Sequence, residues 1–257
     1  VHTRILDAPR HIIVAGPVDP DVILPVLEAG FGGLPRATAS ADTNRAEARP
    51  GVGIIAGKDD AVQSAFRIAL PCVPFDHPDS ASVQLLTGVL GGYTLARLFT
   101  ILREEKGYTY GAYAFNEVRP MGGLTGILTS VGNEFTLDTM RVIAHEVDRI
   151  GSERINDEEF ENARQQILGT FARSNETPQQ TASLVWTTIQ HDLPSDFFAQ
   201  HIARLQALTP DDVRDVQRRI FSTDAWVVGI AGQPDLVREA ITPYVRTIEV
   251  WNPEGYE

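Results

Sequence analysis

Arg103 and Tyr110 are the strongest candidates in this sequence for a chemical role, because they lie seven residues apart across a predicted helix-to-strand corner. A guanidinium group presents a rigid fork of N–H donors that suits a carboxylate or a carbonyl oxygen. A tyrosine hydroxyl can donate a hydrogen bond to an oxygen that gains negative charge during a reaction. Both residues also have ordinary structural uses, because an arginine near a helix C-terminus offsets the helix dipole and a strand tyrosine often only packs.

Motifs of the common hydrolases are missing from the sequence. The six histidines are His2, His11, His77, His145, His191 and His201, and none belongs to a His-x-x-Glu-His motif. The run from His145 to Arg149 is the nearest approach to a zincin motif, with Arg149 in place of the second histidine. We therefore expect no zinc site, and we interpret His145 and Glu146 as a solvent-facing helix pair. No Gly-x-Ser-x-Gly motif occurs, and Gly57-Lys58-Asp59 lacks both the first glycine and the Ser/Thr of a phosphate-binding loop.

The elements that must position Arg103 and Tyr110 follow from the surrounding pattern. After the glycine pair Gly91-Gly92, four apolar residues recur at i, i+3, i+4 and i+7, which predicts a helix with one buried face. These residues are Leu95, Leu98, Phe99 and Leu102. Gly107 is expected to end this helix, and an alternating run predicts a strand over residues 108–115. Arg103 would then lie in the last helical turn and Tyr110 just inside the strand.

The rest of the chain alternates between strand and helix patterns. Alternation at Phe66, Ile68 and Leu70 predicts a strand, and further strands are expected over 124–131 and 226–231. Helices are predicted over 78–90 and 137–150, and from Asn156, with Glu159 as its capping-box partner. Two more are expected to open at 177–178 and 209–212. The fold class is therefore α+β, a mainly antiparallel β-sheet with helices packed on one side.

Composition narrows the range of partners. The net charge of -12 disfavours nucleic acid or an anionic membrane as the main partner, because both require clustered Lys and Arg. No apolar run approaches the ~18 residues of a membrane span. The single Cys72 allows no internal disulfide and is interpreted as a packing residue. No signal peptide is visible, but the sequence starts at Val1 rather than Met, so this absence decides little. The compartment stays open between bacterial cytoplasm and periplasm.

The two ends of the chain resemble each other. Residues 11–23 and 227–237 each show a short apolar strand pattern, a turn, and a helix opened by Pro and Asp. We interpret this as a repeat, with residues 1–36 as the strand-plus-helix tail of a preceding homologous domain. Residues 37–60 are then a linker, and residues 61–257 form the main domain. The run Gly51-Val52-Gly53 within that linker matches a loose dinucleotide-binding pattern by chance, because no predicted strand precedes it.

The block from Leu90 to Tyr110 resembles the insulinase/pitrilysin family of zinc metallopeptidases, the inverted zincins. The resemblance rests on a glycine-rich turn, a helix ending in Arg103-Glu104, and then Gly107 and Tyr110 at the family spacing. It implies a metal-free, C-terminal-type half, in which Gly91, Gly92, Arg103 and Tyr110 contact peptide substrate. By this resemblance Arg103 and Tyr110 also have a catalytic role, facing a zinc ion held by another domain or subunit. In the stretch 93–97 the residues before Arg97 depart from the family, where small polar residues often precede Arg-Leu, while Arg97 and Leu98 themselves match.

The resemblance implies that this chain holds no cofactor and that zinc lies in a partner half carrying His-x-x-Glu-His, in cis or in trans. The fragment alone is expected to be inactive. The alternative is a scaffold or assembly subunit of the same family without proteolytic activity, and a more distant one is an unrelated α+β ligand-binding domain. Natural substrate and oligomeric state are left open. Twenty Arg against two Lys indicate a bacterial, GC-rich genome.

Overall fold

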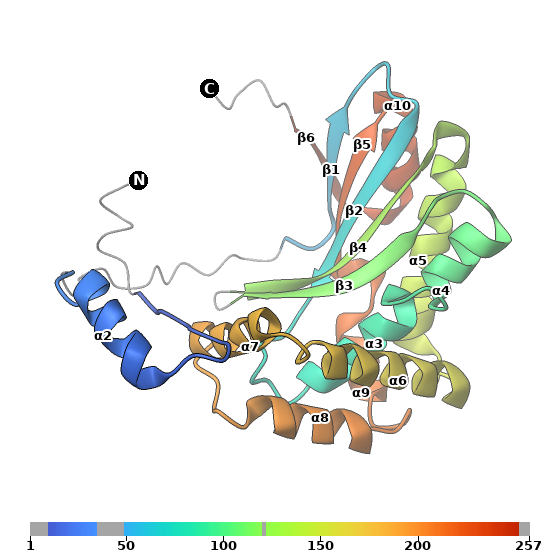
Figure 1. Cartoon of the computed structure of the whole chain (residues 1–257). Coiled ribbons are helices and arrows are strands. Elements are labelled where there is room, and N and C mark those ends of the chain that lie inside the picture. The colour runs from blue at the N-terminus through green and yellow to red at the C-terminus, as the bar shows by residue number, and fades with distance from the viewer. Residues whose placement is uncertain (1–9, 35–48, 120–121, 252–257) are drawn as a thin grey trace.

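The computed structural model of the 257-residue chain describes residues 10–34, 49–119 and 122–251 (Figure 1). The strands are β1 (Val52–Gly57), β2 (Gln63–Pro71), β3 (Ala112–Arg119), β4 (Gly122–Gly132), β5 (Val227–Gly232) and β6 (Thr247–Val250). The longer helices are α2 (Pro20–Phe31), α3 (Ser80–Gly91), α5 (Thr136–Ser152), α6 (Asp157–Arg173), α7 (Pro178–Gln190), α8 (Phe197–Ala207), α9 (Arg214–Ile220) and α10 (Pro234–Ile241). Shorter pieces are α4 (Arg97–Phe99), the π-helix η1 (Thr100–Glu105), and the 3₁₀ turns η2 (Asn133–Phe135), η3 (Thr223–Ala225) and η4 (Thr242–Tyr244).

The strands form a single mixed sheet in the order β3-β4-β2-β5-β1-β6. The pairs β3/β4, β4/β2 and β2/β5 are antiparallel, whereas β1 lies parallel to both β5 and β6. The predicted α+β class with a mainly antiparallel sheet is therefore confirmed. The parallel pairs arise because β1 joins the sheet between β5 and β6, with β5 inserted between it and β2, its neighbour in sequence.

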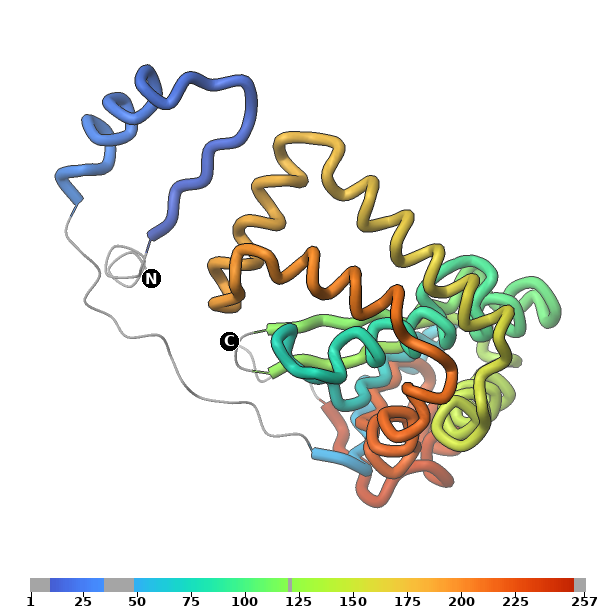
Figure 2. Tube along the Cα trace, turned by 90° about the horizontal axis from the view of Figure 1, so that it is seen from below, coloured from blue at the N-terminus to red at the C-terminus, as the bar shows by residue number. Residues whose placement is uncertain are grey.

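Helices cover one face of the sheet (Figure 1). On β2 the side chains of Phe66, Ile68 and Leu70 point into this covered face and are buried, while Arg67 between them is exposed. The helix α3 packs on β3 and is flanked by α6 and α8, which lie side by side in the view from below (Figure 2). One core cluster joins the sheet to these helices and includes Leu86 of α3 and Phe160 of α6.

The segment formed by residues 10–34 contains the predicted helix but no strand. The helix α2 begins after Asp19, whose side chain accepts from the Asp21 backbone N–H, and Pro20 occupies its first position. Residues 11–16 pair with no strand in the described part of the chain. Apolar side chains of this segment, including Val22, Leu24 and Val26, are exposed. Exposed apolar side chains are unfavourable in water, and among the described residues no other element covers these side chains.

The linker predicted over residues 37–60 needs a correction at its C-terminal end. Val52–Gly57 is β1, which pairs along its whole length with β5 and along its first four residues with β6. The sequence missed this strand because it follows a polar stretch and is too short to show clear alternation. Residues 35–48 lie outside the described part, so the remainder of the linker is not tested.

Candidate functional site

The helix-to-strand corner that carries Arg103 runs from α4 through η1 to β3. Leu98, Phe99 and Leu102 are buried as predicted, whereas Leu95 is 73% exposed and lies before the helix begins at Arg97. The last six residues of this helix are π-helical, a wide turn that recurs at functional sites. Gly107 ends it in a left-handed conformation with φ of +67°, and the Tyr108 N–H donates back to the Leu102 carbonyl. The predicted glycine stop is confirmed.

Arg103 projects from η1 with 44% of its side chain exposed. Its guanidinium carbon lies 4.8 Å from the centroid of the Phe99 ring, and its Nε is 3.4 Å from a carboxylate oxygen of Glu104. The Phe99 ring in turn contacts Tyr113 of β3, with 5.7 Å between centroids. The aromatic ring thus supports the flat side of the guanidinium while the fork of donors still meets solvent.

Tyr110 lies two residues before β3, not inside the strand as predicted. Its backbone belongs to a short turn in which the Thr109 hydroxyl accepts from the Gly111 N–H and is bridged to Thr129 of β4. The side chain is 95% exposed, and within the described residues its hydroxyl has no hydrogen-bond partner. An aromatic ring left this open to water has no packing role in this part of the chain. Arg103 and Tyr110 therefore sit on either side of one corner of the fold, and a common peptide ligand for both remains a prediction.

The two glycines predicted to contact substrate occupy different environments. Gly91 is the last residue of α3 and is buried against β3; a Cβ at this position would lie 2.5 Å from the Ala114 backbone nitrogen. Gly92 is exposed and begins the turn toward α4. The absence of a side chain at Gly91 is therefore required for close helix–strand packing. Substrate contact by either glycine stays a prediction.

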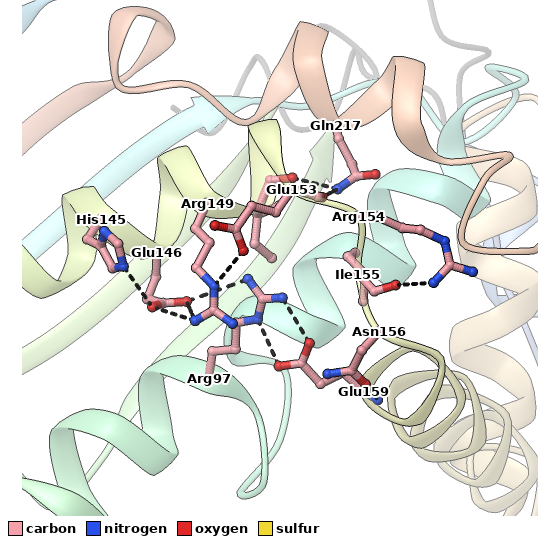
Figure 3. A network of polar contacts seen from close by, with 11 residues as sticks. Arg97, His145, Glu146, Arg149, Glu153, Arg154, Ile155, Asn156, Glu159 and Gln217 are labelled. Carbon is pink, nitrogen blue, oxygen red and sulfur yellow. Dashed lines mark hydrogen bonds and ion pairs between the residues drawn. The ribbon is translucent and has the colours of Figure 1, made fainter.

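A buried ion network holds the start of the helix that carries Arg103. Figure 3 shows Arg97 between α5 and α6, where its Nε and Nη2 donate to the two carboxylate oxygens of Glu159 at 2.9 and 2.8 Å. Its Nη1 lies 3.6 Å from Glu146, which also accepts from Arg149 Nη1 at 3.1 Å. Glu146 is only 2% exposed, so the nearby guanidinium groups of Arg97 and Arg149 must compensate the cost of burying its negative charge.

This network corrects two sequence interpretations. His145 is exposed as predicted, but Glu146 points inward, so the two residues are not a solvent-facing pair. The Asn156 side chain caps α6 by accepting from the Glu159 N–H at 2.8 Å, whereas the Glu159 carboxylate binds Arg97. Helical spacing alone could not predict that the two carboxylates point inward, because their common partner Arg97 lies more than forty residues away in sequence.

Metal-binding potential is absent from the described part of the chain: no group of three or more His, Cys, Asp or Glu side chains there could hold a metal ion. No helix within the described residues is long and apolar enough to span a lipid bilayer. The corner can thus offer hydrogen-bond donors and positive charge, but the residues around it supply no metal-bound nucleophile.

Comparison with known proteins identifies the class to which this metal-free domain belongs. The sequence profile of the "Peptidase M16 inactive domain" family matches residues 11–167, so the chain belongs to that family. The resemblance to the insulinase-type metallopeptidases is thereby confirmed. The matched range begins inside the segment assigned from sequence to a preceding domain, and that domain boundary stays a prediction.

This chain spans about half the length of the proteins that it matches. The uncharacterized zinc protease SCO5738 of Streptomyces coelicolor is 25% identical over 226 residues, which are 83% of this chain and 48% of that protein. The crystal structure of a peptidase M16 inactive domain from Pseudomonas fluorescens has a TM-score of 0.75 at 20% identity, covering 85% of this chain and 52% of that one. A chain of complex III2 from Candida albicans has a TM-score of 0.72 at 14% identity, covering 88% of this chain and 55% of that one.

Proposed function

We propose that this chain is the substrate-binding, metal-free half of a zinc metalloendopeptidase that encloses peptides. The zinc and its His-x-x-Glu-His motif would lie in another domain or subunit; the Streptomyces coelicolor relative, of which this chain spans about half, is named a zinc protease. The observation that carries the proposal is the exposed Tyr110 hydroxyl, which has no partner in the described chain and stands at the same corner as the exposed Arg103.

The roles of the two side chains follow from their donors. When bound in the partner half, zinc would polarise the scissile carbonyl and activate a water molecule. The Tyr110 hydroxyl would donate to the carbonyl oxygen as negative charge develops there, an interaction that strengthens toward the transition state. The Arg103 fork, supported by Phe99, would bind a peptide carbonyl or carboxylate in both the ground state and the transition state.

The position of residues 10–34 supports a two-part assembly. Their exposed apolar side chains fit the tail of a preceding homologous domain, as proposed from the sequence for residues 1–36. In a complete assembly these side chains would be buried in the neighbouring core rather than exposed to water. A domain boundary between this segment and β1 is part of this proposal.

Reconstitution tests the proposed function. The chain is mixed with a purified half that contains His-x-x-Glu-His, and cleavage of an internally quenched peptide is measured with zinc content determined for each half. We expect activity only in the mixture, with zinc retained by the partner half. Tyr110→Phe should lower kcat by ~10²–10³ with little change in KM, as for loss of one oxyanion donor. Tyr244→Phe is the matched control, because Tyr244 ends η4 just before β6, the edge strand opposite β3, and it should keep wild-type turnover.

The alternative function is a scaffold or assembly subunit. It is favoured by the fold that this domain shares with a chain of complex III2 from Candida albicans. Full activity of the partner half alone, with no effect of adding this chain or its Tyr110→Phe variant, would support the scaffold and refute the peptidase role.

A further inference from the structure

A second candidate site lies at the far end of β3 from Tyr110. A cavity of about 260 Å³ opens between the end of β2, the first turns of α3, the end of β3, and α8. Its apolar wall includes Phe75, Val83 and Val118. From Ala112 to Val118 the strand extends about 20 Å, so this cavity is separate from the Arg103 corner.

Two buried polar atoms in the lining have no hydrogen-bond partner within the described residues. They are the hydroxyl oxygen of Ser80, on α3, and Nδ1 of His201, on α8. Ser80 is 7% exposed and His201 is 8% exposed, so bulk water does not satisfy them freely. Buried polar atoms in native proteins are nearly always paired, and two unpaired atoms on residues that line one cavity therefore suggest where a ligand's polar group would bind.

The hydrogen bonds of His201 define what that ligand must offer. Nε2 lies 2.7 Å from the amide oxygen of Gln84, and since an amide oxygen only accepts, Nε2 carries the proton. Burial, and to a smaller degree the nearby Arg204 charge, lowers the pKa of His201 from 6.5 to about 4. The ring is therefore neutral at pH 7, and Nδ1 is a bare acceptor that requires a donor.

The shape and charge of the cavity define the rest of the ligand. None of the residues that line it is Asp, Glu, Lys or Arg, so a charged ligand would lose its hydration without a counter-ion. Two rings line it, those of Phe75 and His201, and each packs on a further ring: Phe75 lies 4.7 Å from the His191 ring and His201 lies 5.5 Å from the Phe197 ring. An apolar cavity of about 150 Å³ already holds benzene, so 260 Å³ accommodates one substituted ring.

We propose that this cavity is a binding site for a neutral phenol-type group, whose ring packs against Phe75 and Val83 and whose hydroxyl pairs with His201 and Ser80. The phenol can come from a free small molecule or from a tyrosine side chain of a peptide. The proposal does not depend on the peptidase role, because it concerns a different part of the domain.

Cys72 provides a direct measurement of occupancy, because it lines the cavity and is the single cysteine of the sequence. Burial raises the pKa of its thiol, so alkylation by iodoacetamide is slow and sensitive to access. In the purified chain, p-cresol should slow Cys72 alkylation in a saturable manner. Toluene, which has the same ring without a hydroxyl, should bind at least about tenfold more weakly, as for loss of a buried hydrogen bond.

Matched variants separate the polar contacts from simple filling of the cavity. Ser80→Ala and His201→Phe should each weaken p-cresol binding about tenfold and reduce its advantage over toluene. Ser82→Ala, on the same helix but outside the cavity lining, is the control and should leave binding unchanged. Circular dichroism verifies that each variant is folded. If His201→Phe does not fold, the result for Ser80→Ala alone decides the test.

A tyrosine tripeptide blocked at both ends identifies the source of the phenol. Protection of Cys72 by both this peptide and p-cresol would assign the site to a peptide side chain, and protection by p-cresol alone would assign it to a small molecule. The proposal is refuted if p-cresol gives no protection up to its solubility limit, or if toluene protects as well as p-cresol does. It is also refuted if p-cresol binding is unchanged in both Ser80→Ala and His201→Phe.

Discussion

The guanidinium carbon of Arg103 lies over the ring of Phe99, 4.8 Å from its centroid, with the ring buried and 44% of the Arg103 side chain exposed. This contact restricts a flexible side chain at little cost, because the ring holds the guanidinium while part of its fork of donors stays open to solvent. In the proposed function, the contact would orient Arg103 toward a peptide better than an isolated surface arginine is oriented.

Replacing Arg103 should therefore affect binding as well as rate. In the reconstituted enzyme, Arg103→Ala should lower kcat/KM by roughly 10- to 100-fold, with a contribution from raised KM, because a charged hydrogen bond contributes about 1.5–3 kcal/mol. Arg103→Lys should recover only part of the loss, since an ammonium lacks the fork. Arg141→Ala, an exposed arginine on α5, is the control. Normal kinetics in Arg103→Ala would exclude its role in the site.

The buried network around Arg97 should determine stability. Arg97→Ala leaves Glu146 buried with one fewer cation, and we expect the free energy of unfolding to fall by about 3 kcal/mol. Urea denaturation measures this change. Arg154→Ala is the matched control, because Arg154 makes ion pairs with Asp157 and Asp211 at the surface and its loss should change stability little. Equal effects of the two substitutions would contradict a structural role for the network.

Gly91 should tolerate no side chain. In Gly91→Ala the new Cβ would lie 2.5 Å from the Ala114 nitrogen and 3.0 Å from its Cβ, so α3 must move away from β3. We expect a loss of about 1–3 kcal/mol in the free energy of unfolding. At Gly169 in α6 the nearest atom to a new Cβ is 3.8 Å away, and Gly169→Ala should instead stabilise the helix by about 0.5–1 kcal/mol. Thermal denaturation of both variants distinguishes packing from helix propensity.

His201 should make stability depend on pH. Its pKa is near 6.5 unfolded and is lowered to about 4 in the fold, mainly by burial. Between these values the unfolded chain binds a proton that the folded chain does not, so the free energy of unfolding decreases as pH falls from 6.5 to 4. The loss is at most about 3 kcal/mol.

The comparison of His201→Gln with wild type isolates this effect. Urea titrations at several pH values should give a shallower decline for His201→Gln over this range. The exposed His145→Gln variant should keep the wild-type slope. If the His201→Gln slope equals that of wild type, the acid sensitivity arises from other groups.

Much of this fold could be predicted from the sequence because its elements carry local signals. Alternation at Phe66, Ile68 and Leu70 indicated β2, and Gly107 marked the end of the helix that carries Arg103. The helix predicted over 137–150 corresponds to α5, whose buried residues include Met140, Ala144 and Val147. In each case the side-chain period or the backbone conformation of one residue was sufficient.

Features that depend on distant partners could not be predicted in this way. β1 is short and is stabilised by β5 and β6, so its own residues looked like a linker. The inward turn of Glu146 depends on Arg97, and the cavity near His201 depends on four elements that meet only after folding. The family spacing of Arg103 and Tyr110 was visible in the sequence, but the wide π-turn and the support from Phe99 were not.

The position of β5 in the middle of the sheet also affects how this domain is made. β5 joins β2 to β1, and its register with β1 pairs Val52 with Val227. During synthesis the sheet stays divided until the ribosome has released residues 227–232, because the strands on either side have no contact with each other. Such long-range pairing raises the contact order and slows folding. At elongation rates of ~5–20 residues per second the half-formed sheet would expose its strand edges for several seconds, and exposed strand edges favour aggregation.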